Sequence, residues 1–232
     1  MNKLIENVQY IYFDQIESTH LYARNYAHLY DGSYAFVANY QSNGIGKGQH
    51  VWLSPKGNLY VSFLLPLLND ATFISLLTAC AIHQTISTLC AKKNVKLHWP
   101  NDIYVDNKKV CGILLEVVDK NKLIISFGIN TTTIPVELLN MAEKVEGIRN
   151  EDLLSEIIEK INEHYNVFCI DKSEVIKYWN KNVLGLHEQI VIKYRDTCVK
   201  GLFNKIDCGG RIVVTCCNGE EKVISTGDMF VI

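Results

Sequence analysis

The stretch of sequence that decides the fold is HWPNDIYVDNKKVCGILLE, residues 98–116. It consists of short runs of β-branched and aromatic residues, which are typical of strands. The turn signals Pro100-Asn101-Asp102 and Asp106-Asn107 separate these runs. Because so few residues lie between neighbouring runs, no crossover helix fits, and the sequence favours antiparallel pairing. The strands predicted in this region are residues 95–99, 103–105, 109–118 and 122–130.

The sequence before and after this antiparallel region predicts helices and further strands. Apolar residues at helical spacing predict a long amphipathic helix over residues 70–92. Either Ser18 or Thr19 could cap a helix that runs to about Leu29. Further strands are predicted at residues 8–14, 34–40 and 58–65, and further helices at residues 151–165 and 172–180.

The tail from about Gly185 has a different pattern, in which glycine-rich turns separate short strands. These strands are predicted at residues 190–194, 211–216 and 222–225, a spacing typical of a small β-barrel of the SH3 type. We therefore predict an α+β fold in two domains. Residues 1–183 would form a mixed, largely antiparallel sheet with flanking helices, and residues 184–232 an SH3-like β domain.

Composition excludes some classes of function. Of the 232 residues, 48% are hydrophobic and 21% are charged, as in ordinary globular proteins. The formal net charge of −2 gives no broad positive field to attract phosphates, so we expect no nucleic-acid partner. The apolar run at residues 59–68 is too short to span a bilayer, and residues 1–10 lack the apolar core of a signal peptide. We therefore expect no membrane partner.

The eight cysteines include no C-x-x-C pair, which leaves little support for a zinc or thioredoxin-like site. Free thiols in a reducing compartment are the simplest account of them, so we expect a cytoplasmic protein.

A glycine-rich polar segment, QSNGIGKGQH at residues 41–50, is the first candidate for chemistry. Its glycines allow close backbone approach to a ligand, its N–H groups suit an anion, and Lys47 adds a mobile positive charge. A flexible connector between strands is the alternative interpretation. The nucleotide-binding pattern G-x-x-x-x-G-K-[ST] does not match, because Gly48 follows Lys47.

Two further candidates lie within the opening stretch. In Trp99-Pro100-Asn101-Asp102, Asp102 could hold Mg²⁺ or a nucleotide hydroxyl while Trp99 walls a pocket; a hairpin turn with a buried tryptophan is the alternative. Lys109 would lie at the charged mouth of a strand that enters the core, although edge-strand lysines also serve to block aggregation. Gly112, inside that strand, implies a close contact with a ligand or another backbone.

Taken together, these segments resemble the biotin protein ligases (biotin–acetyl-CoA-carboxylase ligases). The resemblance spans about residues 8–232 and implies the class II synthetase-like fold of that family. The shared elements follow the family's order: Glu17-Ser18-Thr19, the glycine-rich loop after Tyr40-Gln41, Trp52-x-Ser54-Pro55-x-Gly57-Asn58-Leu59-Tyr60, Trp99-Pro100-Asn101-Asp102, Lys109-x-x-Gly112-Ile113-Leu114-x-Glu116 and Gly128-Ile129-Asn130.

Some positions depart from the family's pattern. The glycine-rich loop usually contains arginines, but Lys47 stands where the family has the arginine that holds the adenylate intermediate. Lysine supplies charge without a bidentate fork. His20 replaces the usual asparagine after Ser-Thr, and His98 replaces the usual basic residue before Trp99. Because the resemblance begins close to Met1, it is to the short class of ligase that lacks an N-terminal DNA-binding domain.

The resemblance implies a two-step reaction that attaches biotin to a lysine of a biotin carboxyl carrier domain, with ATP and Mg²⁺ as cofactors and biotinyl-5′-AMP as the intermediate. A homodimer is also possible, and the loop of residues 42–50 is expected to be mobile without ligand. The implied catalytic residues are Lys109 and Lys47. The implied biotin-binding residues are Ser18, Thr19, Gln41, Gly44, Gly46, Lys109, Gly112 and Leu114. The implied ATP-binding residues are Lys47, Trp52, Asn101, Asp102 and Asn130, with Asp102 also a candidate magnesium ligand.

Two alternatives remain open from the residues. The first is a lipoate–protein ligase or octanoyl transferase of related fold, against which Trp99-Pro100-Asn101-Asp102, Gln41 and the glycine-rich loop favour biotin. The second is a non-catalytic biotin binder, which the lost loop arginines support and the presence of Lys109 and Asp102 opposes.

Overall fold

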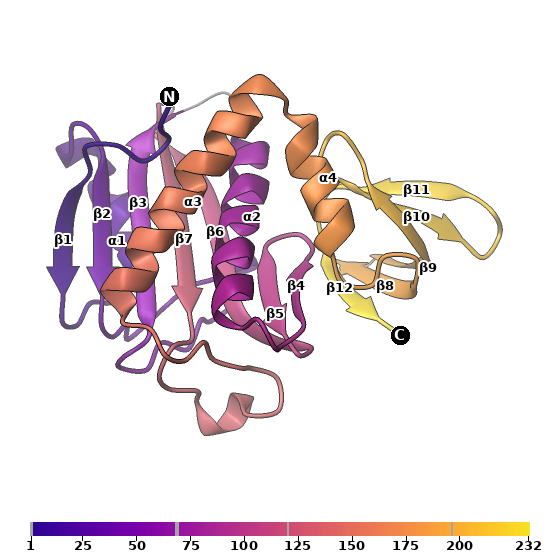
Figure 1. Cartoon of the computed structure of the whole chain (residues 1–232), viewed down its shortest axis with the longest axis horizontal. Helices are drawn as coiled ribbons and strands as arrows, with labels where there is room; N and C mark the ends of the chain where they lie inside the picture. Colours follow the sequence, from indigo (N-terminus) through magenta and orange to yellow (C-terminus); the bar gives the residue numbers. More distant parts are fainter. Residues whose placement is uncertain (1, 68–69, 120, 196) are drawn as a thin grey trace.

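The computed structural model describes residues 2–67, 70–119, 121–195 and 197–232. These residues form one large sheet covered by helices and one smaller sheet that follows it in the chain (Figure 1). The α+β class predicted from the sequence is therefore confirmed.

The large sheet has seven strands in the order β1-β2-β3-β7-β6-β5-β4. Only β1 and β2 are parallel; the other neighbours pair antiparallel. The mixed, largely antiparallel sheet is thus confirmed. Its strands are β1 (Gln9–Phe13), β2 (Tyr34–Ala38), β3 (Leu59–Pro66), β4 (Val95–His98), β5 (Asp102–Val105), β6 (Lys108–Val118) and β7 (Lys122–Ile129).

Side chains alternate between the two faces along each strand, and both faces carry apolar residues. Helices therefore cover both faces of this sheet. On one face, α1 (Thr19–Tyr26) packs against β3 and β7, with Phe36, Leu64 and Ile124 in the apolar layer beneath it. On the other face, α2 (Ala71–Leu89) and α3 (Asn150–Ile170) lie over the sheet (Figure 1). Short 3₁₀ turns occur at Ala27–Leu29, Lys47–Gln49 and Val136–Leu138.

Two expectations about these helices have clear outcomes. Ser18 caps α1, since its hydroxyl accepts a hydrogen bond from the backbone N–H of Leu21 at 3.3 Å. A helix does form within the predicted residues 70–92. The prediction that it is amphipathic is wrong, because α2 is buried on nearly all sides. The large sheet covers one side of α2 while α3 and α4 (Ser173–Asn182) cover others, so the polar side chains of Thr78, His83 and Thr85 are buried as well.

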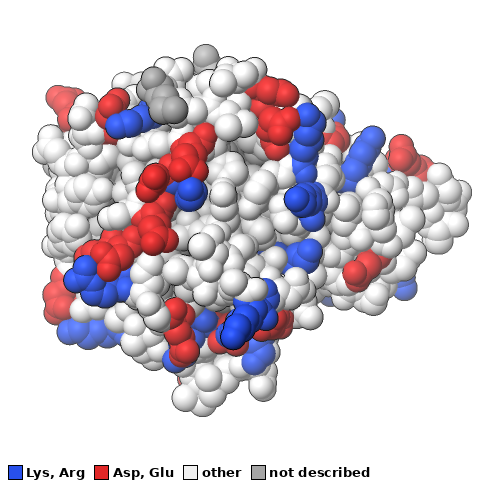
Figure 2. Space-filling view, in the orientation of Figure 1, with Lys and Arg blue, Asp and Glu red and all other residues white. Residues whose placement is uncertain are grey.

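The outer face of α3 carries the charge that α2 lacks. Figure 2 shows acidic side chains along this helix, whose sequence contains Glu151, Asp152, Glu156, Glu159 and Glu163. Its apolar face, with Leu153, Ile157 and Ile161, is buried against α2. The helix also runs further than the predicted 151–165.

The smaller sheet has five antiparallel strands in the order β11-β10-β9-β8-β12. The expected β-rich tail is confirmed, but β9 and β12 were not predicted. Within the described residues, β11 and β12 lie at the two edges of the hydrogen-bonded order, so closure into a barrel is not shown. The strands are β8 (Gln189–Tyr194), β9 (Thr197–Ile206), β10 (Ile212–Cys216), β11 (Glu221–Ile224) and β12 (Asp228–Val231).

The two sheets are joined by specific contacts. Val183 bridges Leu97 of β4, and the backbone N–H of Leu184 donates to the Leu97 carbonyl at 2.8 Å. Trp99 is buried, and its indole Nε1–H donates to the carbonyl of Gly210, in the β9–β10 turn, at 3.1 Å. Among the described residues, no helix is long and apolar enough to cross a membrane.

Candidate active site

The cavity that contains most of the predicted residues lies on the α1 face of the large sheet. From Gly112 onward on β6, and along β7, the even-numbered positions face α1, and cross-strand pairing sets Gly112 opposite Gly128 and Leu114 opposite Ser126. The start of α1 and the glycine-rich loop supply the other walls. The cavity is lined by Ser18, Thr19, His20, Gln41, Ile45, Gly46, Lys47, His50, Val51, Trp52, Tyr60, Val61, Asn101, Asp102, Lys109, Gly112, Ile113, Leu114, Ser126, Phe127, Gly128 and Asp228. These include all the site residues predicted from the sequence except Gly44 and Asn130.

A lysine–carboxylate pair lies in the wall of this cavity. The ammonium Nζ of Lys109 is 2.6 Å from Oδ2 of Asp102 and 5.3 Å from the centre of the Trp52 ring. The other carboxylate oxygen of Asp102, Oδ1, is buried and has no hydrogen-bond partner among the described residues. The pair therefore offers a positive charge and a free carboxylate oxygen at one place, which suits a ligand that carries phosphate and a divalent cation.

Trp52 lies on the flat surface made by two paired glycines. A Cβ atom added at Gly128 would lie 2.4 Å from the indole Nε1 of Trp52, and one added at Gly112 would lie 3.0 Å from the ring. The close contact expected at Gly112 is thus with an aromatic ring. Nε1 of Trp52 is buried without a hydrogen-bond partner among the described residues.

The other end of the cavity is polar, and its hydrogen bonds fix the side chain of Gln41. Oε1 of Gln41 accepts from the backbone N–H of Thr19 at 2.8 Å, while Nε2 donates to the hydroxyl of Ser54 at 2.9 Å. Ser54 in turn donates to the carbonyl of Trp52 at 2.8 Å. This series of hydrogen bonds determines which end of the Gln41 amide accepts. The position of the Gln41 carbonyl oxygen in the cavity wall is therefore defined.

Three residues from the sequence motifs lie behind the cavity. Gly44 packs closely behind the Gln41 side chain. A Cβ atom at this position would come within 2.4 Å of the Ser54 hydroxyl and 3.0 Å of Gln41 Nε2. Asn130 follows β7 and donates through Nδ2 to the carbonyl of Glu143 at 3.1 Å. Trp99 does not line this cavity, because its ring is buried beneath the Gly210 turn.

The glycine-rich loop contacts the smaller sheet. Nζ of Lys47 donates to the carbonyl of Gly227 at 2.7 Å and lies 3.4 Å from Oδ1 of Asp228. Gly48 has a φ of +65°, a conformation that glycine adopts without strain. Lys47 is therefore held by the C-terminal sheet at the rim of the cavity. The predicted mobility of residues 42–50 stays a prediction.

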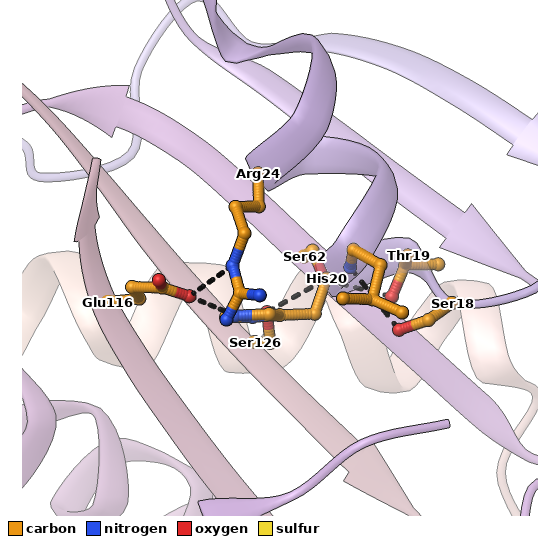
Figure 3. Close-up of polar contacts among 8 residues, drawn as sticks. Ser18, Thr19, His20, Arg24, Ser62, Glu116 and Ser126 are labelled. Atoms are coloured by element: carbon orange, nitrogen blue, oxygen red, sulfur yellow. Dashed lines mark hydrogen bonds and ion pairs between the residues drawn. The ribbon is translucent and has the colours of Figure 1, made fainter. Parts of the chain in front are cut away.

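One polar cluster was missed as a functional feature. His20, noted only as a departure from the family, is buried between the hydroxyl of Ser126 and the carboxylate of Glu116, each 2.7 Å from a ring nitrogen (Figure 3). Burial lowers the pKa of His20, although Glu116 opposes this shift. The alternation of Leu114 and Glu116 along β6 would have placed Glu116 on the cavity face, but the strand pairing that sets Ser126 opposite Leu114 could not be known from sequence.

Comparisons with known proteins agree with this fold. A family model for the Biotin/lipoate A/B protein ligase family matches residues 12–131. The chain belongs to this family.

Several individual proteins are similar to this chain. Biotin–protein ligase 1, chloroplastic, of Arabidopsis thaliana is 30% identical over 175 residues, which cover 68% of this chain and 47% of that protein. Bifunctional ligase/repressor BirA of Salmonella typhimurium is 34% identical, over 78% of this chain and 61% of that protein. The chain spans about half the length of the plant relatives it matches.

Solved structures match over nearly the whole chain. The biotin protein ligase of Aquifex aeolicus in complex with biotin and ATP has a TM-score of 0.86 at 24% identity, covering 98% of this chain and 99% of that one. A mutant form of the Aquifex aeolicus ligase in complex with biotin has a TM-score of 0.81 at 25% identity, covering 96% of this chain and 97% of that one. The biotin ligase-like fold expected from the resemblance is thereby confirmed.

Proposed function

We propose that this protein is an ATP-dependent biotin–protein ligase, which joins biotin to a lysine of a biotin carboxyl carrier domain through biotinyl-5′-AMP. The observation that carries the proposal is the Lys109–Asp102 pair beside Trp52 in the cavity wall, with the Gln41–Thr19 hydrogen bonds at the polar end. Membership of the family and the names of its relatives support the same activity.

In the first step, a carboxylate oxygen of biotin attacks the α-phosphorus of ATP and pyrophosphate leaves. Two anions repel, so the site has to supply positive charge where the new bond forms. Lys109 is the residue for this role, and Lys47 at the rim adds a second cation. Holding the reactants in line contributes further, up to about 7–11 kcal/mol in favourable systems.

In the second step, the amine of the acceptor lysine attacks the acyl carbon, the amide bond forms and AMP leaves. The mixed anhydride is sensitive to water, so the loop of residues 42–50 would have to cover it. The contact of Lys47 with Gly227 ties this loop to the smaller sheet, which would let that sheet influence how long the intermediate is kept.

Asp102 is the residue for magnesium. Its Oδ1 has no partner among the described residues, and magnesium is commonly held by one or two carboxylates together with substrate phosphates. When bound, the ion would neutralise part of the triphosphate charge. Among the described residues there is no group of three His, Cys, Asp or Glu side chains that could hold a metal, which suits an ion that arrives with ATP.

The polar end of the cavity favours biotin over lipoate. A ureido ring has one carbonyl and two N–H groups, and Thr19, Gln41 and Ser126 offer hydroxyl and amide partners for them. A dithiolane ring has no N–H or carbonyl group, so it would form none of these hydrogen bonds with the wall. Ligation of lipoate is therefore the weaker candidate.

Further proposals concern the setting of the enzyme. The acceptor would be a biotin carboxyl carrier protein, with no nucleic-acid or membrane partner, and β1 leaves a sheet edge at which a homodimer could form. The eight cysteines are free, which supports a cytoplasmic location for the protein.

We place the domain boundary at residues 183–184, where Val183 still bridges β4 and Gly185 begins a turn with φ +76°.

The test is ATP–pyrophosphate exchange with Mg²⁺, comparing biotin with lipoate. We expect biotin-dependent exchange that falls at least about 10²-fold in Lys109→Ala, the usual cost of removing one group that stabilises transition-state charge. Lys108→Ala is the matched control, since Lys108 is the adjacent lysine and its Nζ donates outside the cavity, to the Leu139 carbonyl. Exchange with lipoate instead would assign the sister activity, and biotin binding without exchange would identify a binder.

A further inference from the structure

A continuous row of hydrogen bonds runs along the polar end of the cavity, from the Glu116 carboxylate to the Gln41 amide. Figure 3 shows the row from Glu116 to Thr19, where residues from α1, β3, β6 and β7 point toward one another. In order, the contacts are Glu116 to His20 at 2.7 Å, His20 to Ser126 at 2.7 Å, Ser126 to Ser62 at 2.7 Å, Ser62 to Thr19 at 2.8 Å, and Thr19 to Gln41 at 3.1 Å.

Both ends of this row can only accept hydrogen bonds. At one end, Glu116 also accepts from Arg24 at 3.0 Å. Partial burial opposes ionisation of Glu116, but the hydrogen bonds from His20 and Arg24 lower its pKa, so it is a carboxylate at neutral pH. At the other end, Oε1 of Gln41 accepts from the Thr19 backbone N–H, and the Ser54 contact fixes the amide in this orientation.

The row contains fewer hydrogens than contacts when the His20 ring is neutral. Five contacts lie between the two acceptor ends, and each needs one hydrogen. The three hydroxyl groups supply one each, and the His20 ring supplies one when neutral and two when protonated. A neutral His20 therefore leaves the row one hydrogen short, so two neighbouring acceptor atoms in it face each other without a proton between them.

We propose that His20 is the positioning residue that selects the ligand head group: in its neutral form it keeps the hydroxyl row one hydrogen short, so that the row accepts an N–H from the bound ligand. Thr19, His20 and Ser126 all line the cavity, so a ligand donor can reach the row. A ureido ring has N–H groups to donate, whereas a dithiolane ring has none. This inference rests on the proposed biotin ligase function.

The charges around His20 set the direction of its pH dependence. Arg24 from α1 and Glu116 from β6 are the charged groups that face it, while β3 and β7 contribute only the hydroxyls of Ser62 and Ser126. Burial favours the neutral ring. As the pH falls through the pKa of His20, the ring gains its second proton, the row becomes complete, and the ligand N–H loses its advantage. Biotin affinity should therefore fall about three- to tenfold at acidic pH, the effect of one net hydrogen bond.

The experiment is isothermal titration of the full chain with biotin, without ATP, between pH 5.5 and 7.5 in buffers of different ionisation enthalpy. For the wild type near pH 6, biotin binding should release a fraction of a proton, approaching one where His20 is fully protonated in the free protein. His20→Asn, which keeps a polar side chain that does not titrate, should lose this release. Ser126→Ala, which keeps His20 but interrupts the row, should also lose most of it.

His164→Asn is the matched control. His164 is another largely buried histidine whose pKa burial lowers, but it bonds Gln84 on α2, away from the cavity, so its replacement should leave the proton release unchanged. Equal proton release by wild type and His20→Asn, or no release by the wild type, would overturn the proposal for His20 while leaving biotin ligation intact. Failure of the wild type to bind biotin would overturn both.

Discussion

The ammonium group of Lys109 lies 2.6 Å from one carboxylate oxygen of Asp102, and the other oxygen of that carboxylate is buried without a partner among the described residues. Asp102 thus fixes Lys109 through one oxygen and presents its other oxygen as a hydrogen-bond acceptor beside it. Lys109 is one-third exposed and Asp102 less so, so the pair is open to the cavity on the lysine side, where a phosphate would have to bind.

Replacing Asp102 by asparagine should reduce adenylation more than biotin binding. The amide keeps the size of the side chain but removes the charge that holds Lys109 and would contact magnesium, so we expect kcat for pyrophosphate exchange to fall about 10²-fold. The KM for biotin should change little. The control is Asp106→Asn, in the neighbouring turn, where the backbone has a positive φ that asparagine tolerates. An unchanged kcat in Asp102→Asn would contradict this role.

Replacing Lys47 by arginine should lengthen the retention of the adenylate. The arginine fork can bind phosphate through two hydrogen bonds, whereas lysine acts as a point charge. We expect less free biotinyl-AMP and less labelling of non-acceptor proteins, measured by chromatography of the released nucleotide and by blotting. Lys56→Arg is the control, since Lys56 pairs with the exposed Asp14 outside the cavity. Faster release from Lys47→Arg would show that the Gly227 contact matters more than phosphate binding.

Replacing Gly128 by alanine should displace Trp52. The new methyl group would lie 2.4 Å from the indole Nε1, a distance that forces the ring away from the sheet. If Trp52 stacks on adenine, the KM for ATP should rise about tenfold, the loss of about 1.4 kcal/mol of stacking and contact energy. Gly209→Ala, where the nearest atom is on the flexible Arg211 side chain at 3.3 Å, should leave the KM unchanged. Equal kinetics for both variants would remove Trp52 from the ATP site.

Replacing Trp99 by phenylalanine should destabilise the protein. The substitution removes the indole N–H that bonds the Gly210 carbonyl and leaves a buried acceptor unpaired, at a cost of about 1–3 kcal/mol in the free energy of unfolding. Trp52→Phe shortens a half-buried ring and removes no hydrogen bond among the described residues, so it should cost less. Urea denaturation of both variants would measure the difference. A larger loss for Trp52→Phe would show that the link to Gly210 carries little stability.

The sequence predicted the order of most elements and half of the residues that line the cavity, because local patterns determine both. Apolar strands are interrupted by glycines, a tryptophan and charged residues where the cavity forms. These motifs can therefore be recognised in the sequence alone. The burial of α2 was not visible, since it depends on α3 and α4, which come at least 60 residues later in the chain. Strand β9 was missed because polar residues such as Lys200 and Asn204 weaken its alternation.

The hydroxyl row could not be predicted either, for a related reason. His20, Ser62 and Ser126 lie on three separate elements, and only the register that sets Ser62 opposite Ser126 brings them together. A one-residue slip of β7 would turn Ser126 to the other face of the sheet. Each residue is ordinary in its own segment, so the row appears only once strand pairing is known.

The bond from Lys47 to Gly227 joins positions 180 residues apart, and this has a consequence during protein synthesis. A nascent chain that has not yet released Gly227 and Asp228 from the ribosome has no anchor for the glycine-rich loop, although β1 to β7 are already complete. Partial translation products would thus lack the Lys47 contact at the rim of the cavity. Anchoring the loop through a late residue restricts this contact to chains whose smaller sheet has formed.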